Sequence, residues 1–189
     1  MLLQTAMRER ISIGHNRDGQ PVLARHCRNA SGGCDQRLAE FAKYIVDAGQ
    51  SFGIDPWLMA AMAFKESGLN PFARGAMGEL GILQIHPKRR DARQVRFIRD
   101  EYYRLRCHKE AGACQREVVQ HAAGVLSRSL TLCNGDLAQA LGAYNTGRCG
   151  GNRTYSKSVL NERGELRRVA GLEHEQAAVT QAPTRRKRS

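Results

Sequence analysis

Glu66 is the residue whose position in the sequence best predicts acid chemistry. Residues 57–64 are apolar nearly throughout, which indicates a buried helix, and Met59, Met62 and Ala63 share the face of Glu66 at three-and-four spacing. Burial disfavours the charged form of a carboxylate, and so does the negative C-terminal end of a helix. Both effects raise the pKa, as a general acid at neutral pH requires. The alternative is a solvent-exposed glutamate on a last helical turn, with no chemical role.

The helix that carries Glu66 is bounded by residues typical of helix ends. Asp55 is a good N-cap, and Pro56 suits the first helical position because its missing N–H would be unpaired there anyway. Gly68 is a natural stop. The sequence therefore predicts a helix between Asp55 and Gly68, with Glu66 close to its C-terminal end.

A glycine-rich segment follows this helix. Gly75, Gly78 and Gly81 recur at every third position, and the short apolar run 82–85 comes next, before Pro87. Glycine permits positive φ angles and close approach of the backbone to a ligand. We therefore expect a tight β-hairpin beside a ligand groove.

Three motifs in this order resemble those of the soluble lytic transglycosylase family. They are Glu66-Ser67, the segment 78–85 and the segment 143–147 (Ala-Tyr-Asn-Thr-Gly), with Asn70-Pro71 between the first two. The resemblance covers roughly residues 50–160. It implies a mostly α, lysozyme-like (α+β) domain built around a buried central helix, with a small β-hairpin beside the active-site groove.

The resemblance also implies cleavage of peptidoglycan by one carboxyl group. In this family a single glutamate protonates the glycosidic oxygen between MurNAc and GlcNAc. As a carboxylate, the same residue then assists attack of the MurNAc 6-hydroxyl on C1, which gives a 1,6-anhydro sugar and consumes no water. Glu66 matches that glutamate. We expect no cofactor and no metal ion.

The matched motifs assign further residues to the substrate groove. Tyr144 matches a tyrosine that hydrogen-bonds the catalytic glutamate, and Gln84 matches a glutamine that lines the groove. Ser67 and Asn145 match polar positions near the acid. Each has a structural alternative: core packing for Tyr144, satisfaction of backbone groups for Gln84, and helix capping for Ser67 and Asn145. The family often has Ser where Gly75 stands, so one hydrogen bond to the substrate is in doubt.

Two rival functions remain open. A goose-type lysozyme-like hydrolase on the same fold would need a second carboxylate, and Glu79 in the glycine segment is the best candidate, because Asp136 is better explained as a helix start. The other rival is a non-catalytic, basic module that binds the cell wall.

The net charge of +12 and the pI near 10 favour anionic partners. No nucleic-acid-binding motif accompanies the charge, and aromatic residues make up only 6% of the chain, so peptidoglycan is favoured over nucleic acid. Residues 88–106 are basic, and Val95, Ile98, Tyr102 and Leu105 recur at helical spacing, which predicts a helix. Its charged face either grips anionic glycan peptides or is simply solvated.

Six cysteines, none in a C-x-x-C pair, indicate disulfides and an oxidising compartment rather than a zinc site. Fifteen pairings are possible for six cysteines, and we favour the sequence-local set. That set is Cys27–Cys34, Cys107–Cys114 and Cys133–Cys149. The alternative is buried free thiols in a cytosolic protein.

The predicted location is the periplasm or the exterior of the cell. No signal peptide and no membrane-spanning run are visible in this sequence. Export would then use another route, such as a secretion or conjugation system or a phage particle, and we expect a monomer.

Three regions are predicted along the chain. Residues 1–35 are expected to form an irregular arm packed on the domain, residues 36–165 the catalytic domain, and residues 166–189 a basic, disordered tail. Within the domain we expect helices over residues 36–50, 118–126 and 137–144. A final short helix is expected to contain Tyr155, Val159 and Leu160.

Overall fold

Helix α4, Pro56–Ser67, lies at the centre of the fold and begins and ends as the sequence predicts. The Asp55 side chain accepts a hydrogen bond from the backbone N–H of Trp57 at 3.0 Å. Gly68 ends the helix in the left-handed region, with φ of 60°. Residues 58–63 are all buried, so α4 is surrounded by other elements. It packs against α3, Cys34–Phe52, and α9, Arg153–Val169.

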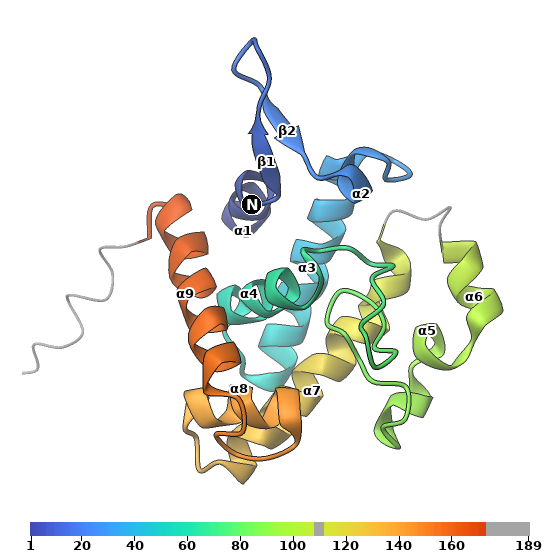
Figure 1. The fold of residues 1–189 in the computed structure, drawn as a ribbon, viewed down its shortest axis with the longest axis vertical. Helices are drawn as coiled ribbons and strands as arrows, with labels where there is room; N and C mark the ends of the chain where they lie inside the picture. The colour runs from blue at the N-terminus through green and yellow to red at the C-terminus, as the bar shows by residue number, and fades with distance from the viewer. Residues whose placement is uncertain (108–111, 173–189) are drawn as a thin grey trace, which may run out of the picture.

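The computed structural model describes residues 1–107 and 112–172, and in them the fold is mostly α-helical, as predicted (Figure 1). The elements besides α3, α4 and α9 are α1 (Leu2–Arg10), β1 (Ser12–His15), β2 (Pro21–Leu23), α2 (Arg25–Arg28), η1 (Asp91–Gln94), α5 (Arg96–Arg99), α6 (Glu101–Arg106), η3 (Ala113–Gln115), α7 (Arg116–Leu132) and α8 (Leu137–Thr146). No helix in the described ranges has the length and apolar character needed to cross a membrane.

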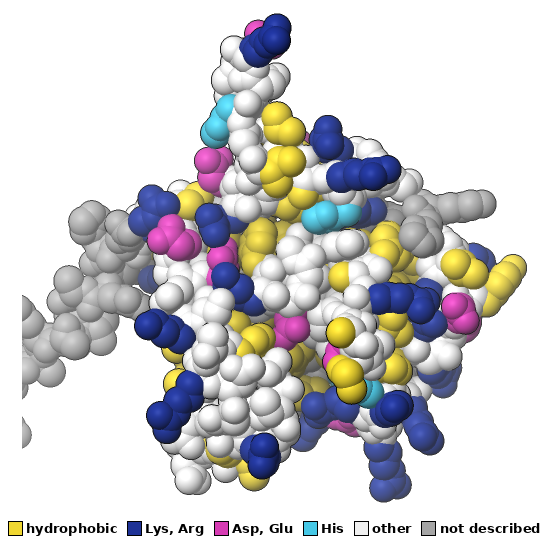
Figure 2. All heavy atoms as spheres, in the orientation of Figure 1, with side chains coloured by type: hydrophobic (Ala, Val, Ile, Leu, Met, Phe, Trp, Pro, Cys, Tyr) yellow, Lys and Arg dark blue, Asp and Glu magenta, His cyan; other side chains and the backbone are white. Residues whose placement is uncertain are grey.

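The N-terminal arm is more regular than predicted. Leu3, Ala6 and Met7 are buried at three-and-four spacing, and this stripe packs α1 against α3 and α9. Strands β1 and β2 then form an antiparallel pair with an irregularity in register after Ser12. The pair projects from the helical body (Figures 1 and 2). Residues 1–35 therefore contain a helix and a strand pair where a largely irregular arm was expected, because the apolar residues of α1 recur at helical spacing.

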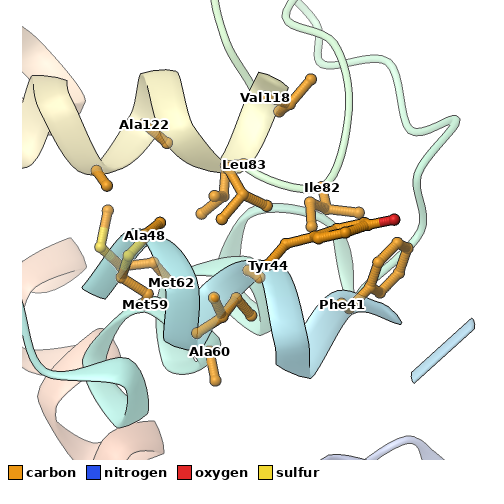
Figure 3. Packing of buried hydrophobic residues seen from close by; sticks show 14 of the residues in the cluster. Phe41, Tyr44, Ala48, Met59, Ala60, Met62, Ile82, Leu83, Val118 and Ala122 are labelled. Atoms are coloured by element: carbon orange, nitrogen blue, oxygen red, sulfur yellow. The ribbon is translucent and has the colours of Figure 1, made fainter. Parts of the chain in front are cut away.

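The small sheet lies in this arm and not beside the groove, where the glycine segment was predicted to form it. Residues 74–85 form turns with two isolated bridges, Arg74 to Leu80 and Leu80 to Ile85. The buried side chain of Gln115 also binds this segment, and its Oε1 accepts from the Ile82 N–H at 3.1 Å. Ile82 and Leu83 are fully buried, and Figure 3 shows them among core side chains such as Phe41 and Val118.

The single helix predicted over residues 88–106 is instead three short pieces, η1, α5 and α6. The backbone is extended at Val95 and at Asp100. Asp100 uses its side chain as an N-cap and accepts from the Tyr103 N–H at 2.8 Å. Because Asp100 caps the start of α6, the helix is broken between α5 and α6. The apolar residues nevertheless keep their helical spacing across this break.

Helices α3, α7 and α8 match the predictions, whereas the final helix is longer than expected. Asp136 caps α8 by accepting from the Gln139 N–H at 2.9 Å, and Gly147 ends it. Helix α9 continues to Val169, beyond the predicted domain end at residue 165. Residues 173–189, most of the predicted basic tail, lie outside the described residues.

All three predicted disulfides are present. They join Cys27 to Cys34, Cys107 to Cys114, and Cys133 to Cys149. The last bridge joins the loop before α8 to the loop after it. Three disulfides fit an oxidising compartment.

We expect no free thiols when the protein is denatured without reductant and labelled with a maleimide. Peptide mapping should recover the same three pairs, and reduction should lower the melting temperature, because each short loop contributes about 2–3 kcal/mol. Labelling of all six cysteines in unreduced protein would contradict this assignment.

Candidate active site

The C-terminal end of α4 opens into a cleft of about 260 Å³. Its walls come from α4, the glycine segment and its continuation, α7 and α8. The lining residues are Glu66, Glu79, Gln84, Ile85, His86, Arg89, Val125, Tyr144 and Asn145. Four residues predicted from the motifs supply carboxyl, amide and hydroxyl groups to this one cleft. Glu79 lies there too, and it was predicted both to bind substrate and to be the best candidate for the second acid of a hydrolase.

Glu66 is held by a tyrosine that the sequence analysis missed. The hydroxyl of Tyr155 donates to Glu66 Oε1 at 2.5 Å. Tyr155 lies in the first turn of α9, whose N-cap Asn152 accepts from the Tyr155 N–H at 2.9 Å. The packing of α9 against α4 therefore places a phenol directly against the carboxyl group.

The pKa of Glu66 is raised from its usual value of 4.5 to about 7. Burial is the main cause, because it disfavours the charged form. The hydrogen bond from Tyr155 acts in the opposite direction, and the negative charge of Glu79 raises the pKa further. At neutral pH a large share of Glu66 is thus protonated and able to donate a proton, as the position of Glu66 in the sequence predicted.

Tyr144 is buried as predicted, but its predicted partner was wrong. Its hydroxyl donates to the backbone carbonyl of Leu83 at 2.9 Å, which ties α8 to the apolar end of the glycine segment. Burial raises the pKa of both Tyr144 and Tyr155 above the usual value. Both phenols therefore stay protonated and remain donors at neutral pH.

Ser67 joins the end of α4 to the glycine segment. Its Oγ lies 2.9 Å from the carbonyl oxygen of Ile82 and 3.1 Å from that of Ala63. This is a link between two elements that both border the cleft. Direct contact of Ser67 with substrate stays a prediction.

Gln84 lines the cleft, as the motif predicts, and its side chain also hydrogen-bonds backbone groups, as the structural alternative predicts. Its Nε2 donates to the carbonyls of Gly81 at 2.9 Å and Ala73 at 3.2 Å. A Cβ atom at Gly75 would lie 2.7 Å from Gln84 Oε1 and 2.2 Å from Glu79 Oε2. Glycine at this position thus gives both polar side chains room at the cleft, which a serine would restrict.

Asn145 and Glu79 each accept a hydrogen bond from a nearby group. Asn145 Oδ1 accepts from Asn152 Nδ2 at 2.9 Å, which joins the end of α8 to the start of α9. Glu79 Oε2 accepts from the Met77 N–H at 3.0 Å. Their contact with substrate stays a prediction.

His86 and Val125 line the cleft but were not predicted as site residues, whereas Arg89 belongs to the basic segment 88–106 that was considered for binding anionic glycan peptides. His86 and Arg89 follow the glycine segment directly, and this position is the sequence feature that could have indicated them as cleft residues. Val125 lies far from the motifs along the chain, and Tyr155, eight residues after the 143–147 motif, belongs to none of them. In the described ranges, no group of three or more His, Cys, Asp or Glu side chains is placed to hold a metal ion.

Residues 43–162 match the family model described as the Transglycosylase SLT domain. The match covers more than half of the chain and includes Glu66, all the residues that line the cleft, and Tyr155. The chain therefore belongs to the SLT transglycosylase family, which confirms the resemblance. Membership supports a peptidoglycan-related function of the lytic transglycosylase type.

Tyr155→Phe should lower the cleavage rate about tenfold to a hundredfold, since a hydrogen bond to a charged group is worth roughly 1.5–3 kcal/mol. Because the bond from Tyr155 lowers the pKa of Glu66, the alkaline limb of the pH–rate profile should also move to higher pH. Rates of wall cleavage between pH 5 and pH 9 check both effects.

Tyr144→Phe is the matched control for this experiment. It leaves the Leu83 carbonyl without its tyrosine partner, so it should lower stability by about 1–2 kcal/mol without moving the pH profile. A Tyr144→Phe profile shifted like that of Tyr155→Phe, or an unchanged Tyr155→Phe profile, would contradict the assignment of the two tyrosines.

Glu66→Gln should stabilise the protein at alkaline pH. The folded state binds the Glu66 proton with a pKa of about 7, against 4.5 as the usual value, so wild-type stability falls as pH rises between those values. Below pH 4.5 both states are protonated and the penalty is absent. The variant should therefore exceed the wild type by about 1–3 kcal/mol at pH 8 and by little at pH 4. Urea unfolding at both pH values measures this, and an equal difference at both would contradict it.

Proposed function

We propose that this protein is a lytic transglycosylase that cleaves the MurNAc-β-1,4-GlcNAc bond and forms 1,6-anhydroMurNAc, with Glu66 as the general acid and base. The observation that carries the proposal is a half-buried carboxyl group with a pKa of about 7 that lines a polar cleft. Membership of the SLT family supports peptidoglycan as the substrate.

The reaction balances with Glu66 alone. The carboxyl proton passes to the glycosidic oxygen as the bond from that oxygen to C1 of MurNAc breaks, and GlcNAc leaves with a free hydroxyl group. The resulting carboxylate accepts the proton of the MurNAc 6-hydroxyl while its oxygen bonds to C1. Glu66 ends protonated, and neither water nor a cofactor is consumed.

The bond from Tyr155 suits a group that must act first as acid and then as base. Because Tyr155 donates to Oε1, the other carboxyl oxygen is left to carry the transferable proton. Once the proton has moved, the same donor stabilises the carboxylate. Burial and this hydrogen bond act in opposite directions on the pKa and leave it near neutrality, where a general acid and base works best.

A hydrolase of goose-type lysozyme character is the second candidate. The observation in its favour is that Glu79 lines the same cleft and its charge acts on Glu66. A water molecule activated by Glu79 would then replace the 6-hydroxyl as nucleophile. The products differ, because hydrolysis leaves a reducing MurNAc end.

Mass spectrometry of digested sacculi distinguishes these functions. We expect anhydro ends from wild type, and a loss of about 10²–10⁴-fold in Glu66→Gln, because an amide cannot donate the proton. Glu79→Gln should retain the anhydro product. Reducing ends that vanish in Glu79→Gln would establish the hydrolase instead, and wild type that binds sacculi without releasing products would establish a non-catalytic wall-binding module.

The proposal also covers the compartment in which the protein acts and the larger machine that it serves. The substrate lies outside the cytoplasmic membrane, and three disulfides fit an oxidising location there. We place the protein in the periplasm or outside the cell as a monomer that opens the wall for a secretion, conjugation or phage assembly.

A further inference from the structure

A second cavity, of about 160 Å³, adjoins the cleft that contains Glu66. Arg89 and Val125 line both cavities. The second cavity extends along α7 to Arg128 and Leu132, and Ala143 of α8 closes its side. The cleft therefore continues beyond Glu66 into the second cavity, which is lined by arginine guanidinium groups and by apolar side chains.

The positive charge of this cavity exceeds the negative charge beside it. Asp91, at the start of η1, accepts a hydrogen bond from Arg128 Nη2 at 2.6 Å and one from Arg89 Nε at 3.3 Å. Two guanidinium groups thus share one carboxylate. The third neighbour, His121, adds no charge at neutral pH because burial lowers its pKa. The cluster retains one net positive charge, and Figure 2 shows further Lys and Arg side chains around the region of η1 and α5.

The two arginines remain accessible while they bind Asp91. The Arg128 side chain is 61% exposed and that of Arg89 is 37% exposed. A guanidinium group has five N–H donors, so one carboxylate partner leaves donors for a second anion. Leu132, which is 64% exposed, adds apolar surface beside them. The cavity therefore suits a ligand that combines a carboxylate with short aliphatic groups.

We propose that this cavity is an anion subsite in which Arg89 and Arg128 bind free carboxylates of the peptide borne by the glycan. The proposal rests on the proposed function, which places a muramyl sugar in the adjoining cleft. The peptide on that sugar carries carboxylates and alanine methyl groups, and so has the chemistry of the cavity. Peptide-bearing strands are then the preferred substrate class.

The test compares two forms of one substrate. Soluble peptide-bearing glycan strands are used as they are, and after their carboxylates have been converted to amides with ammonia and a carbodiimide. Amidation keeps the bulk of the peptide and removes its negative charge. Wild type should cleave the native strands with a kcat/KM about threefold to fivefold higher, the range expected of an exposed ion pair.

Arg128→Gln should remove most of this preference. Its kcat/KM should fall about threefold to fivefold on native strands and change little on amidated strands. Arg128→Lys keeps the charge and should retain most of the preference. Arg25→Gln, which removes an exposed charge on α2, is the matched control and should behave like wild type. An equal effect of Arg128→Gln on both substrates, or none on either, would overturn the subsite.

A binding measurement separates this proposal from the proposed function. In the Glu66→Gln background no cleavage interferes, so the affinity for each strand is measured directly by calorimetry. Tighter binding of native strands that is lost with Arg128→Gln supports the subsite even where wild type releases no anhydro product. Equal affinity for the two strands in the Glu66→Gln protein would overturn the subsite whatever the reaction proves to be.

Discussion

A hydrogen bond from Tyr155 to the half-buried carboxyl group of Glu66 is the interaction on which the site depends. Burial raises the pKa of Glu66, whereas the hydrogen bond from Tyr155 lowers it. The phenol stabilises the charged form inside a cleft that disfavours it, and the pKa settles at about 7. This balance requires α9 to hold its position against α4 closely, because a hydrogen bond weakens steeply with distance and angle.

The contacts between α4 and α9 show how that position is maintained. Arg163 binds Asp55 at the N-terminal end of α4, whereas Tyr155 binds Glu66 at the other end, so the two helices run antiparallel. Between these contacts lies Glu162, only 6% exposed and bound by Arg10 through two bonds of 2.9 and 3.1 Å. A buried carboxylate without such a partner would be strongly destabilising. Helix α1, which lies outside the residues matched to the family, thus supports the helix that orients the acid.

Features set by neighbouring residues were predictable from the sequence, and features set by distant contacts were not. Asp55 and Gly68 determine the ends of α4 through local capping, and the sequence-local disulfides follow the same logic. Tyr155 lies outside the recognised motifs, so the role of binding Glu66 was assigned to Tyr144, which lies in one of them. The glycine segment forms turns with two isolated bridges in place of a regular hairpin, and Gln115, from another part of the chain, binds its backbone, a contact that no local pattern reveals.

The central claim is that Glu66 titrates near neutrality in the folded protein. Its carboxyl carbon can be followed by NMR in protein labelled with ¹³C at the glutamate δ-carbon, with the resonance assigned by its absence from Glu66→Gln. A titration midpoint near pH 7 is expected. A midpoint near 4.5, the usual value for this side chain, would show that the cleft does not hold the proton and would contradict a role for Glu66 as acid and base.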